Sequence, residues 1–370
     1  MKGRASKKSQ RTIRYAVVGL GHIAQVAVLP AFAHAARNSQ LTALVSDDPV
    51  KREKLARQYG IKQTYSYAQY DECLAGGYIE AVYIALPNHL HCDYSVRAAR
   101  AGIHVLCEKP MAVTERECEQ MIKAADMHRV KLMIAYRLHF EEANMKAVQL
   151  VQSGKLGEPR LFNSVFTLQV ENKDNIRLQK EMGGGTLYDI GIYCINAARY
   201  LFQEEPIEVS AFSARGSGRR FKEVDEMTGA TMRFPHDRIA TFICSFGASD
   251  VSAYDVVGTK GHLRVDPAYE YAGELKHVLT VNGNSKTRKF SPRDQFAPEL
   301  MYFSNCILEG RSPEPSGKEG LIDVRIIRAL YRSAESGRPV TLHVSKNGRR
   351  PTLSQEIKRP PVTKPHLVRA

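Results

Sequence analysis

Long apolar runs are missing from this 370-residue sequence, and none approaches the roughly 18 residues that a membrane helix requires. Basic residues open the chain, but no apolar segment follows them as it would in a secretory signal. The seven cysteines include no C-x-x-C pair, so they indicate neither a zinc site nor a disulfide framework. We therefore expect a cytoplasmic protein with reduced thiols, no membrane segment and no metal.

Acidic residues are almost absent from the two ends of the chain. The formal net charge is +14, yet residues 1–14 hold six basic residues without an acid, and residues 346–370 hold seven against one. The chain between them is close to neutral, which argues against nucleic-acid binding. We expect 1–14 to be a basic tail and 346–370 to be a basic, proline-containing arm.

The length predicts two domains, at roughly 150 residues for each. Between residues 15 and 137, short apolar runs alternate with helical segments, which predicts an α/β domain with a doubly wound parallel sheet. From 138 to 345, alternating runs separated by turn signals at 235–237 and 258–261 predict an α+β domain with a large, mainly antiparallel sheet. The strands expected in the first domain are 13–18, 41–46, 81–86, 103–107 and 131–135.

A glycine-rich turn follows the first of these strands and opens a helical pattern: Gly19-Leu20-Gly21-His22-Ile23-Ala24. Gly19 permits a tight turn, Gly21 lets the backbone approach a pyrophosphate, and Ala24 allows the helix to pack closely on the strand. Backbone amides at the start of the helix would face the phosphates. Placed between a strand and a helix, the motif predicts a dinucleotide site.

The end of the second strand leaves the choice of dinucleotide open. An acid at the position of Asp47 would bind the adenosine ribose of NAD. Ser46, Lys51 and Arg52 could instead hold the 2′-phosphate of NADP if Asp47 turned away.

Further polar residues follow the later strands, at the edge where open parallel sheets bind ligands. Leu86-Pro87-Asn88 and His91 follow one strand, and Glu108-Lys109-Pro110 follow the next. Asn88 could line the site or cap the neighbouring helix. In the second domain, Asp189 and Tyr193 are four residues apart on a predicted helix and share a face, although Asp189 could cap that helix and Tyr193 could simply pack.

Together these motifs resemble the Gfo/Idh/MocA oxidoreductase family, and within it the glucose–fructose oxidoreductase group, over residues 13–345. Phe296-Ala297-Pro298-Glu299 is similar as well. The main matching residues are Gly19-x-Gly21-x-x-Ala24, Pro87-Asn88-x-x-His91, Glu108-Lys109-Pro110, Tyr136-Arg137-x-His139 and the segment from Gly183 to Asn196.

The resemblance implies a Rossmann domain and a second domain whose open sheet forms the contact of a homodimer or homotetramer. It implies catalysis by Lys109, Asp189 and Tyr193. Ser46 and Lys51 match residues that contact NADP in the family, whereas Asp47 departs from the usual glycine. The expected cofactor set is Gly19, Leu20, Gly21, His22, Ile23, Ala24, Ser46, Asp47, Lys51, Leu86, Pro87, Asn88, His91, Glu108, Lys109 and Arg137. The expected substrate set is Lys109, Tyr136, His139, Asp189 and Tyr193.

The chemistry of these side chains agrees with hydride transfer. Moving a hydride from a carbinol carbon also requires moving the hydroxyl proton, and a positioned acid or base accelerates that step. Tyr193 offers a phenolic proton, and Lys109 could lower its pKa or bind the developing alkoxide. We therefore hypothesise an NAD(P)-dependent oxidoreductase acting on a hydroxyl or carbonyl of a sugar or cyclic polyol. The alternatives are a catalytically silent NAD(P)-sensing regulatory protein and a nicotinamide-dependent glycosidase.

Overall fold

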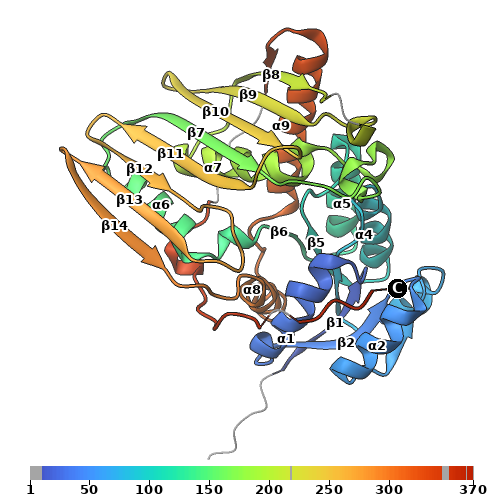
Figure 1. Ribbon diagram of the computed structural model, residues 1–370. Coiled ribbons are helices and arrows are strands. Elements are labelled where there is room, and N and C mark those ends of the chain that lie inside the picture. The colour runs from blue at the N-terminus through green and yellow to red at the C-terminus, as the bar shows by residue number, and fades with distance from the viewer. Residues whose placement is uncertain (1–10, 217–218, 344–349, 364, 370) are drawn as a thin grey trace, which may run out of the picture.

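Two β-sheets organise the molecule, one in each half of the chain (Figure 1). The computed structural model describes residues 11–216, 219–343, 350–363 and 365–369. Most of the predicted basic tail, residues 1–10, therefore lies outside the described residues, as does the start of the predicted arm. No helix among the described residues is long and apolar enough to cross a membrane.

The first sheet has six parallel strands in the order β3-β2-β1-β4-β5-β6, which confirms the predicted doubly wound fold. The strand order reverses between β1 and β4, so a ligand crevice is expected at their carboxyl ends. The short edge strand β3 was not predicted, because three partly exposed residues give no apolar run. The strands are β1 (Ile13–Val18), β2 (Ser39–Val45), β3 (Gln63–Tyr65), β4 (Ala81–Ile84), β5 (His104–Glu108) and β6 (Leu132–Ala135).

Helices cover both faces of this sheet. One face carries η1 (Ala24–Val28), α1 (Leu29–Ala35), α2 (Pro49–Tyr59) and α8 (Phe296–Leu308). The other carries α3 (Tyr70–Ala75), α4 (His91–Arg100) and α5 (Glu115–Met127).

Helix α8 falls within the range 138–345 that was predicted for the second domain, yet it packs on the first sheet. Tyr15 and Ser304 share a hydrogen bond of 2.7 Å between their hydroxyl oxygens, and Asn38 Nδ2 donates to the carbonyl of Met301 at 2.9 Å. Leu300 and Phe303 are fully buried against this face. Sequence order could not reveal this placement, because a sheet face accepts an apolar helix from any part of the chain.

The second sheet has nine strands in the order β14-β13-β12-β11-β7-β10-β9-β8-β15. Only the β7–β10 pair is parallel, so the prediction of a mainly antiparallel sheet is confirmed. The strands are β7 (Pro159–Thr167), β8 (Glu208–Ala214), β9 (Met227–Phe234), β10 (Arg238–Ser245), β11 (Val251–Gly258), β12 (Gly261–Val265), β13 (Leu275–Val281), β14 (Asn284–Phe290) and β15 (Val340–Thr341).

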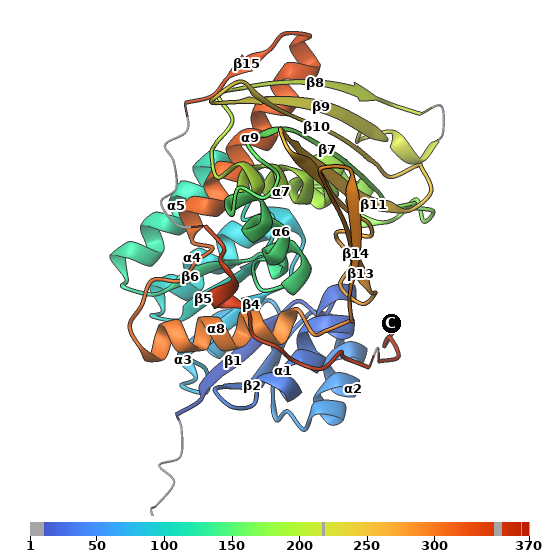
Figure 2. The same ribbon diagram turned by 90° about the vertical axis from the view of Figure 1, so that its left-hand side faces the viewer.

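Helices α6 (Glu142–Gln152), α7 (Ile192–Phe202) and α9 (Gly317–Ser336) lie on one face of the second sheet, which curves over them (Figure 2). A wider π-helical segment, η6 (Leu187–Gly191), leads directly into α7. The short 3₁₀ turns are η2 (Asn88–Leu90), η3 (Arg137–His139), η4 (Ile176–Leu178), η5 (Lys180–Met182), η7 (Arg219–Phe221) and η8 (Leu353–Gln355).

A buried charge cluster joins α7, α9 and the C-terminal arm. The guanidinium of Arg199, which is fully buried, contacts Glu205 at 2.5 Å, Glu319 at 2.8 Å and Asp323 at 2.5 Å. Arg350 of the arm contacts the same Glu205, and Glu319 at 3.3 Å. Two cations thus neutralise most of the charge of three carboxylates. The arm was expected to be extended, and it is, but it packs against the body of the protein instead of projecting from it.

Candidate active site

The glycine-rich turn lies at the carboxyl end of β1. Gly19 has a φ of +94°, and a β-carbon there would lie 2.5 Å from the carbonyl oxygen of Ala85, so the turn needs glycine. A β-carbon on Gly21 would meet no atom within 4 Å. The backbone of Gly21 is therefore open to a ligand, while Ala24 is fully buried against the strand. This combination fits the pyrophosphate of a dinucleotide.

Charges of both signs surround the end of β2. Asp47 is exposed and accepts a hydrogen bond of 2.6 Å from the amide of Tyr67. Lys51 pairs with Asp48 at 2.8 Å, and Arg52 donates to the carbonyl of Ser46 at 2.7 Å. Asp48 also caps α2. Both the acid suited to NAD and the bases suited to NADP are thus brought together here.

The two polar residues after β4 have separate roles. Asn88 does not cap α4, because its Nδ2 donates to the carbonyl of Gly183 at 2.8 Å and the helix has no side-chain cap. His91 is fully buried, with its ring nitrogens 2.9 Å from the carbonyl of Leu86 and 2.8 Å from that of Pro110. Burial lowers the pKa of His91. His91 therefore braces the loops after β4 and β5 without reaching the crevice.

Lys109 and Asp189 are 80 residues apart in sequence but are in contact in the structure. Lys109 Nζ donates to Asp189 Oδ1 at 3.1 Å and to the Asp189 carbonyl at 2.8 Å, and Arg177 Nε donates to Asp189 Oδ2 at 2.5 Å. Burial opposes ionisation of Asp189, but the two cations hold the pKa of its carboxyl well below its usual range. Burial would likewise lower the pKa of Lys109, yet the adjacent carboxylate raises it overall. A protonated ammonium is thus fixed at the edge of β5.

Tyr193 lies between two cations. Lys109 Nζ is 5.0 Å from the centre of its ring and the guanidinium carbon of Arg137 is 4.9 Å away. Arg137 Nε also donates to the Tyr193 hydroxyl at 3.3 Å. The remaining nitrogens of Arg137 bind Gln295 Oε1 at 2.5 Å and the carbonyl of Tyr269. Lys109, Asp189 and Tyr193 are therefore brought together as the resemblance implied.

Two buried carboxyl groups lie beneath this cluster. Glu108 accepts hydrogen bonds from the Tyr83 hydroxyl at 2.8 Å and from the amide of Lys109 at 3.2 Å. Glu299 is fully buried, and neither of its carboxyl oxygens has a hydrogen-bond partner in the part of the chain that the structure describes. Burial raises the pKa of both groups, and the charge of Glu108 raises that of Glu299 further.

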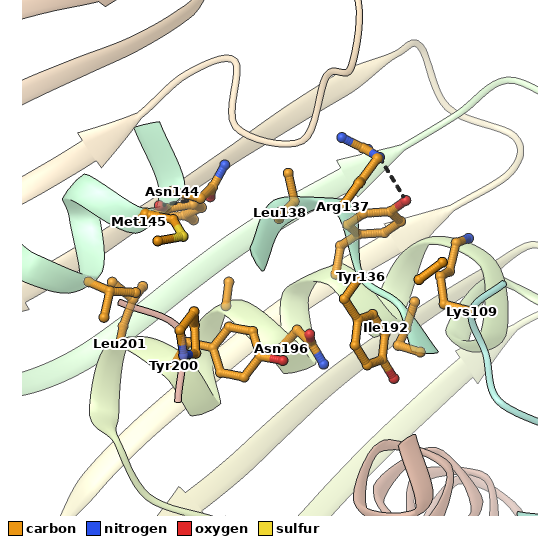
Figure 3. A pocket seen from close by; sticks show the side chains of 16 residues that line it. Lys109, Tyr136, Arg137, Leu138, Asn144, Met145, Ile192, Asn196, Tyr200 and Leu201 are labelled. Atoms are coloured by element: carbon orange, nitrogen blue, oxygen red, sulfur yellow. Dashed lines mark hydrogen bonds between the residues drawn. The ribbon is translucent and has the colours of Figure 1, made fainter. Parts of the chain in front are cut away.

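A pocket opens from the cluster (Figure 3), and the empty space between its lining residues, open solvent included, is about 560 Å³. Lys109 and Arg137 lie at one end of it, and Tyr200 and Leu201 at the other. Tyr136 also lines it, but its hydroxyl is turned to Asp323 at 2.5 Å. Apolar side chains form most of the remaining wall, with Asn144 and Asn196 as polar exceptions. Such a lining suits a small ligand oriented by a few polar groups.

The placement of His139 contradicts its assignment to the substrate site. His139 is fully buried, does not line the pocket and packs edge-on against Tyr200 at 4.9 Å between ring centres. Burial lowers its pKa to about 3, so the ring is neutral. Residues 137–139 form a 3₁₀ turn, in which Arg137 and His139 point in different directions.

Arg177 joins the cluster through Asp189, although nothing in the sequence marked it. It comes from η4, a 3₁₀ turn in an irregular segment, where no periodicity distinguishes it from a surface arginine. Gln295, which fixes Arg137, was missed for the same reason, since it precedes α8 as an unremarkable polar residue. No metal site accompanies these residues: the described part of the chain has no group of three or more His, Cys, Asp or Glu side chains placed to hold an ion.

Comparison with known proteins identifies the family. Residues 13–136 match the model of the oxidoreductase family with an NAD-binding Rossmann fold, and residues 144–264 match the GFO/IDH/MocA C-terminal domain. D-xylose 1-dehydrogenase [NADP(+)] of Haloarcula marismortui is 33% identical over 337 residues, which cover 89% of this chain and 93% of the relative. The chain belongs to the Gfo/Idh/MocA oxidoreductase family.

Two solved structures share the fold of this chain. The crystal structure of aldose-aldose oxidoreductase from Caulobacter crescentus, complexed with glycerol, superimposes with a TM-score of 0.86 at 40% identity, covering 90% of this chain and 100% of that one. Levoglucosan dehydrogenase in complex with NADH and levoglucosan has a TM-score of 0.78 at 23% identity, covering 90% and 99% of the two chains. At that identity the second likeness shows the fold alone.

Proposed function

We propose that this chain is an NAD(P)-dependent sugar oxidoreductase that oxidises an aldose at its anomeric carbon. The observation that carries the proposal is the junction of Lys109, Asp189 and Tyr193 at the carboxyl edge of the dinucleotide sheet. The names of two relatives support the substrate class, since one is a D-xylose 1-dehydrogenase and the other an aldose-aldose oxidoreductase.

Each residue of the cluster has a distinct part in the reaction. Bound NAD(P) supplies the hydride acceptor. In its deprotonated form, the phenolate oxygen of Tyr193 would take the proton from the reacting hydroxyl and become the neutral phenol, and the ammonium of Lys109 would stabilise the negative charge that develops on the reacting oxygen. Asp189 keeps Lys109 protonated and aimed, and Arg177 holds Asp189 from the other side. Gly19 and Gly21 admit the pyrophosphate, and Asp47 with Lys51 and Arg52 meets the adenosine ribose or its 2′-phosphate.

Replacing the lysine tests this assignment. Lys109→Ala removes the charge without touching the glycine-rich turn, so turnover of D-xylose and other aldoses falls by about 10²-fold or more while cofactor Kd stays within a few-fold. Cofactor reduction is followed by absorbance over a panel of sugars, and binding by calorimetry. The exposed Lys173 provides the control Lys173→Ala, which retains full activity. Unchanged turnover in Lys109→Ala overturns the proposal. Sugar release from a glycoside without net cofactor reduction would identify a glycosidase instead.

We also propose that the open face of the second sheet pairs with another copy of the chain. Apolar side chains are exposed on five neighbouring strands of this face, from Phe212 (78% exposed) on β8 to Val251 (44%) on β11. Ile239 is opposite Leu161 in the register, which makes the apolar surface continuous across the parallel pair. Monomers rarely expose such a patch. Ile243→Lys should convert dimers to monomers in light scattering, whereas Met127→Lys on α5 should not; an Ile243→Lys protein of unchanged mass contradicts the interface.

The cytoplasm is the compartment we propose. The support is that all seven cysteines are buried as free thiols.

A further inference from the structure

The C-terminal arm links the charge cluster of the second domain to the helices of the first (Figure 2). Its described part starts at Arg350, which binds Glu205 and Glu319. Further on, Glu356 pairs with Arg293 at 3.0 Å, and the carbonyl of Pro360 accepts from the amide of Asp294 at 3.2 Å. These contacts fix the first half of the arm along the N-terminal end of α8.

The second half of the arm crosses the dinucleotide domain. Arg359 Nε donates to the carbonyl of His34, at the end of α1, at 3.0 Å. Leu367 and Val368 then pack against the apolar cluster formed by the first sheet with η1, α1 and α8. Figure 1 shows this part of the chain running past α8 and α1 to the C-terminus.

The arm reaches the turn through one side chain, Gln25. The amide of Val368 donates to Gln25 Oε1 at 2.8 Å, and Gln25 Nε2 donates to the carbonyl of Val368 at 3.2 Å. The same Nε2 donates to the carbonyl of Leu20 at 3.0 Å, between Gly19 and Gly21. Gln25 is only 3% exposed, so water does not compete freely for these bonds. A buried amide thus couples the backbone of the arm to the backbone of the turn.

Holding this turn matters because glycine gives it little conformational preference of its own. Gly19 needs a positive φ, and Gly21 has no side chain to pack. If the turn must become ordered when the pyrophosphate binds, the cost of ordering it lowers the affinity for the cofactor. A turn that is already held in shape does not carry this cost. Gln25 supplies a fixed point next to both glycines, and the arm supplies a fixed point for Gln25.

We propose that the arm is an intramolecular strap and that Gln25 is the positioning residue through which it holds the glycine-rich turn ready for NAD(P). The strap rests on the proposed function in one respect, that this turn binds the cofactor. Gln25 acts on affinity through the turn and takes no part in the chemistry. Loss of the strap therefore raises the cofactor Kd and KM, and leaves kcat at saturating cofactor unchanged.

A thermodynamic cycle on the full-length protein tests the strap. The variants are a deletion of residues 366–370, Gln25→Ala, and both together. The deletion raises the Kd measured by calorimetry about tenfold, as expected for loss of a buried pair of hydrogen bonds. It adds nothing once Gln25 is alanine, because the coupling runs through that side chain. Amide hydrogen exchange of residues 19–25 in the cofactor-free protein rises in both single variants.

A control and four outcomes decide between the strap and a purely structural arm. Glu356→Gln weakens the arm at Arg293, far from the turn, and leaves the Kd unchanged. A deletion that lowers the melting temperature but alters neither the Kd nor the exchange of the turn overturns the strap. So does a deletion effect that persists in full in the Gln25→Ala background. If the intact chain binds neither NAD nor NADP, the proposed function falls together with the strap; equal Kd values in intact and shortened chains remove the strap alone.

Discussion

Asp189→Asn should move the alkaline limit of activity to lower pH. In the intact site the carboxylate of Asp189 lies 3.1 Å from Lys109 Nζ and raises the pKa of the lysine above its usual 10.5, even though burial acts in the opposite direction. The asparagine has nearly the same shape but no charge. Burial and the positive charge of the nearby Arg177, which both lower the pKa of Lys109, then remain.

The distance sets the size of the shift. A unit charge at 3.1 Å contributes about 1 kcal/mol in a water-like dielectric and about 5 kcal/mol at an effective dielectric constant of about 20. These energies are the stabilisation of the ammonium that the asparagine removes, so the pKa of Lys109 falls. Because activity requires the ammonium, it is lost as pH rises through this pKa, so a lower pKa brings the loss to a lower pH.

The assay is kcat/KM with an aldose across the neutral and alkaline range, with cofactor affinity measured in parallel. Asp174→Asn, at an exposed position of the same domain, serves as the control and keeps the profile of the parent protein. An Asp189→Asn profile whose alkaline limb coincides with that of the parent would refute the reasoning. It would mean that deprotonation of Lys109 does not set the alkaline limit of activity.

Three further perturbations have defined outcomes. Gly21→Ala places a methyl group in the open space over the turn, so cofactor affinity measured by calorimetry drops at least tenfold while the melting temperature is unchanged. Gly19→Ala lowers both the cofactor affinity and the melting temperature, because alanine does not fit the strained turn. Equal melting temperatures in the two variants would contradict the strained turn. Asp47→Asn removes a charge that repels a 2′-phosphate, so NADP binds more tightly and the ratio of the NAD to the NADP dissociation constant rises about tenfold. The control Glu53→Gln, on the exposed face of α2, leaves this ratio unchanged. Arg199→Met leaves Asp323 without its cation and lowers the free energy of unfolding by about 3–5 kcal/mol in denaturant titration; a loss below about 1 kcal/mol would contradict the cluster's role.

The glycine-rich turn and the strand ends could be predicted because local rules govern them. Parallel strands bring their carboxyl ends to one edge, so Asn88 and Lys109 had to lie near the turn of Gly19. The meeting of Lys109 with Asp189 has no local signal, and only the resemblance to a family placed them together. Asn88 shows the limit of a local rule, since a cap was as reasonable as the interdomain hydrogen bond that it makes to Gly183.

Other features depend on tertiary contacts that no spacing encodes. Arg177 is indistinguishable in sequence from the many exposed arginines of this basic chain until its turn is folded against Asp189. His139 was assigned to the substrate site through the family motif that it shares with Tyr136 and Arg137, but residues 137–139 form a 3₁₀ turn in which His139 is buried in the core. The basic arm was predicted to be separate from the body because of its charge, yet the side chain of its Arg350 is buried in the charge cluster of the second domain.

The position of α8 has a consequence for how the chain folds as it is synthesised. Tyr15 and its partner Ser304 are 289 residues apart, so the part of the first sheet that α8 covers stays exposed until most of the protein has left the ribosome. A nascent chain ending at residue 137 would hold every glycine and strand of the dinucleotide motif but would expose the apolar surface that Leu300 and Phe303 later bury. Maturation of the cofactor site therefore waits for the far end of the chain, and a fragment containing only the first 137 residues should aggregate.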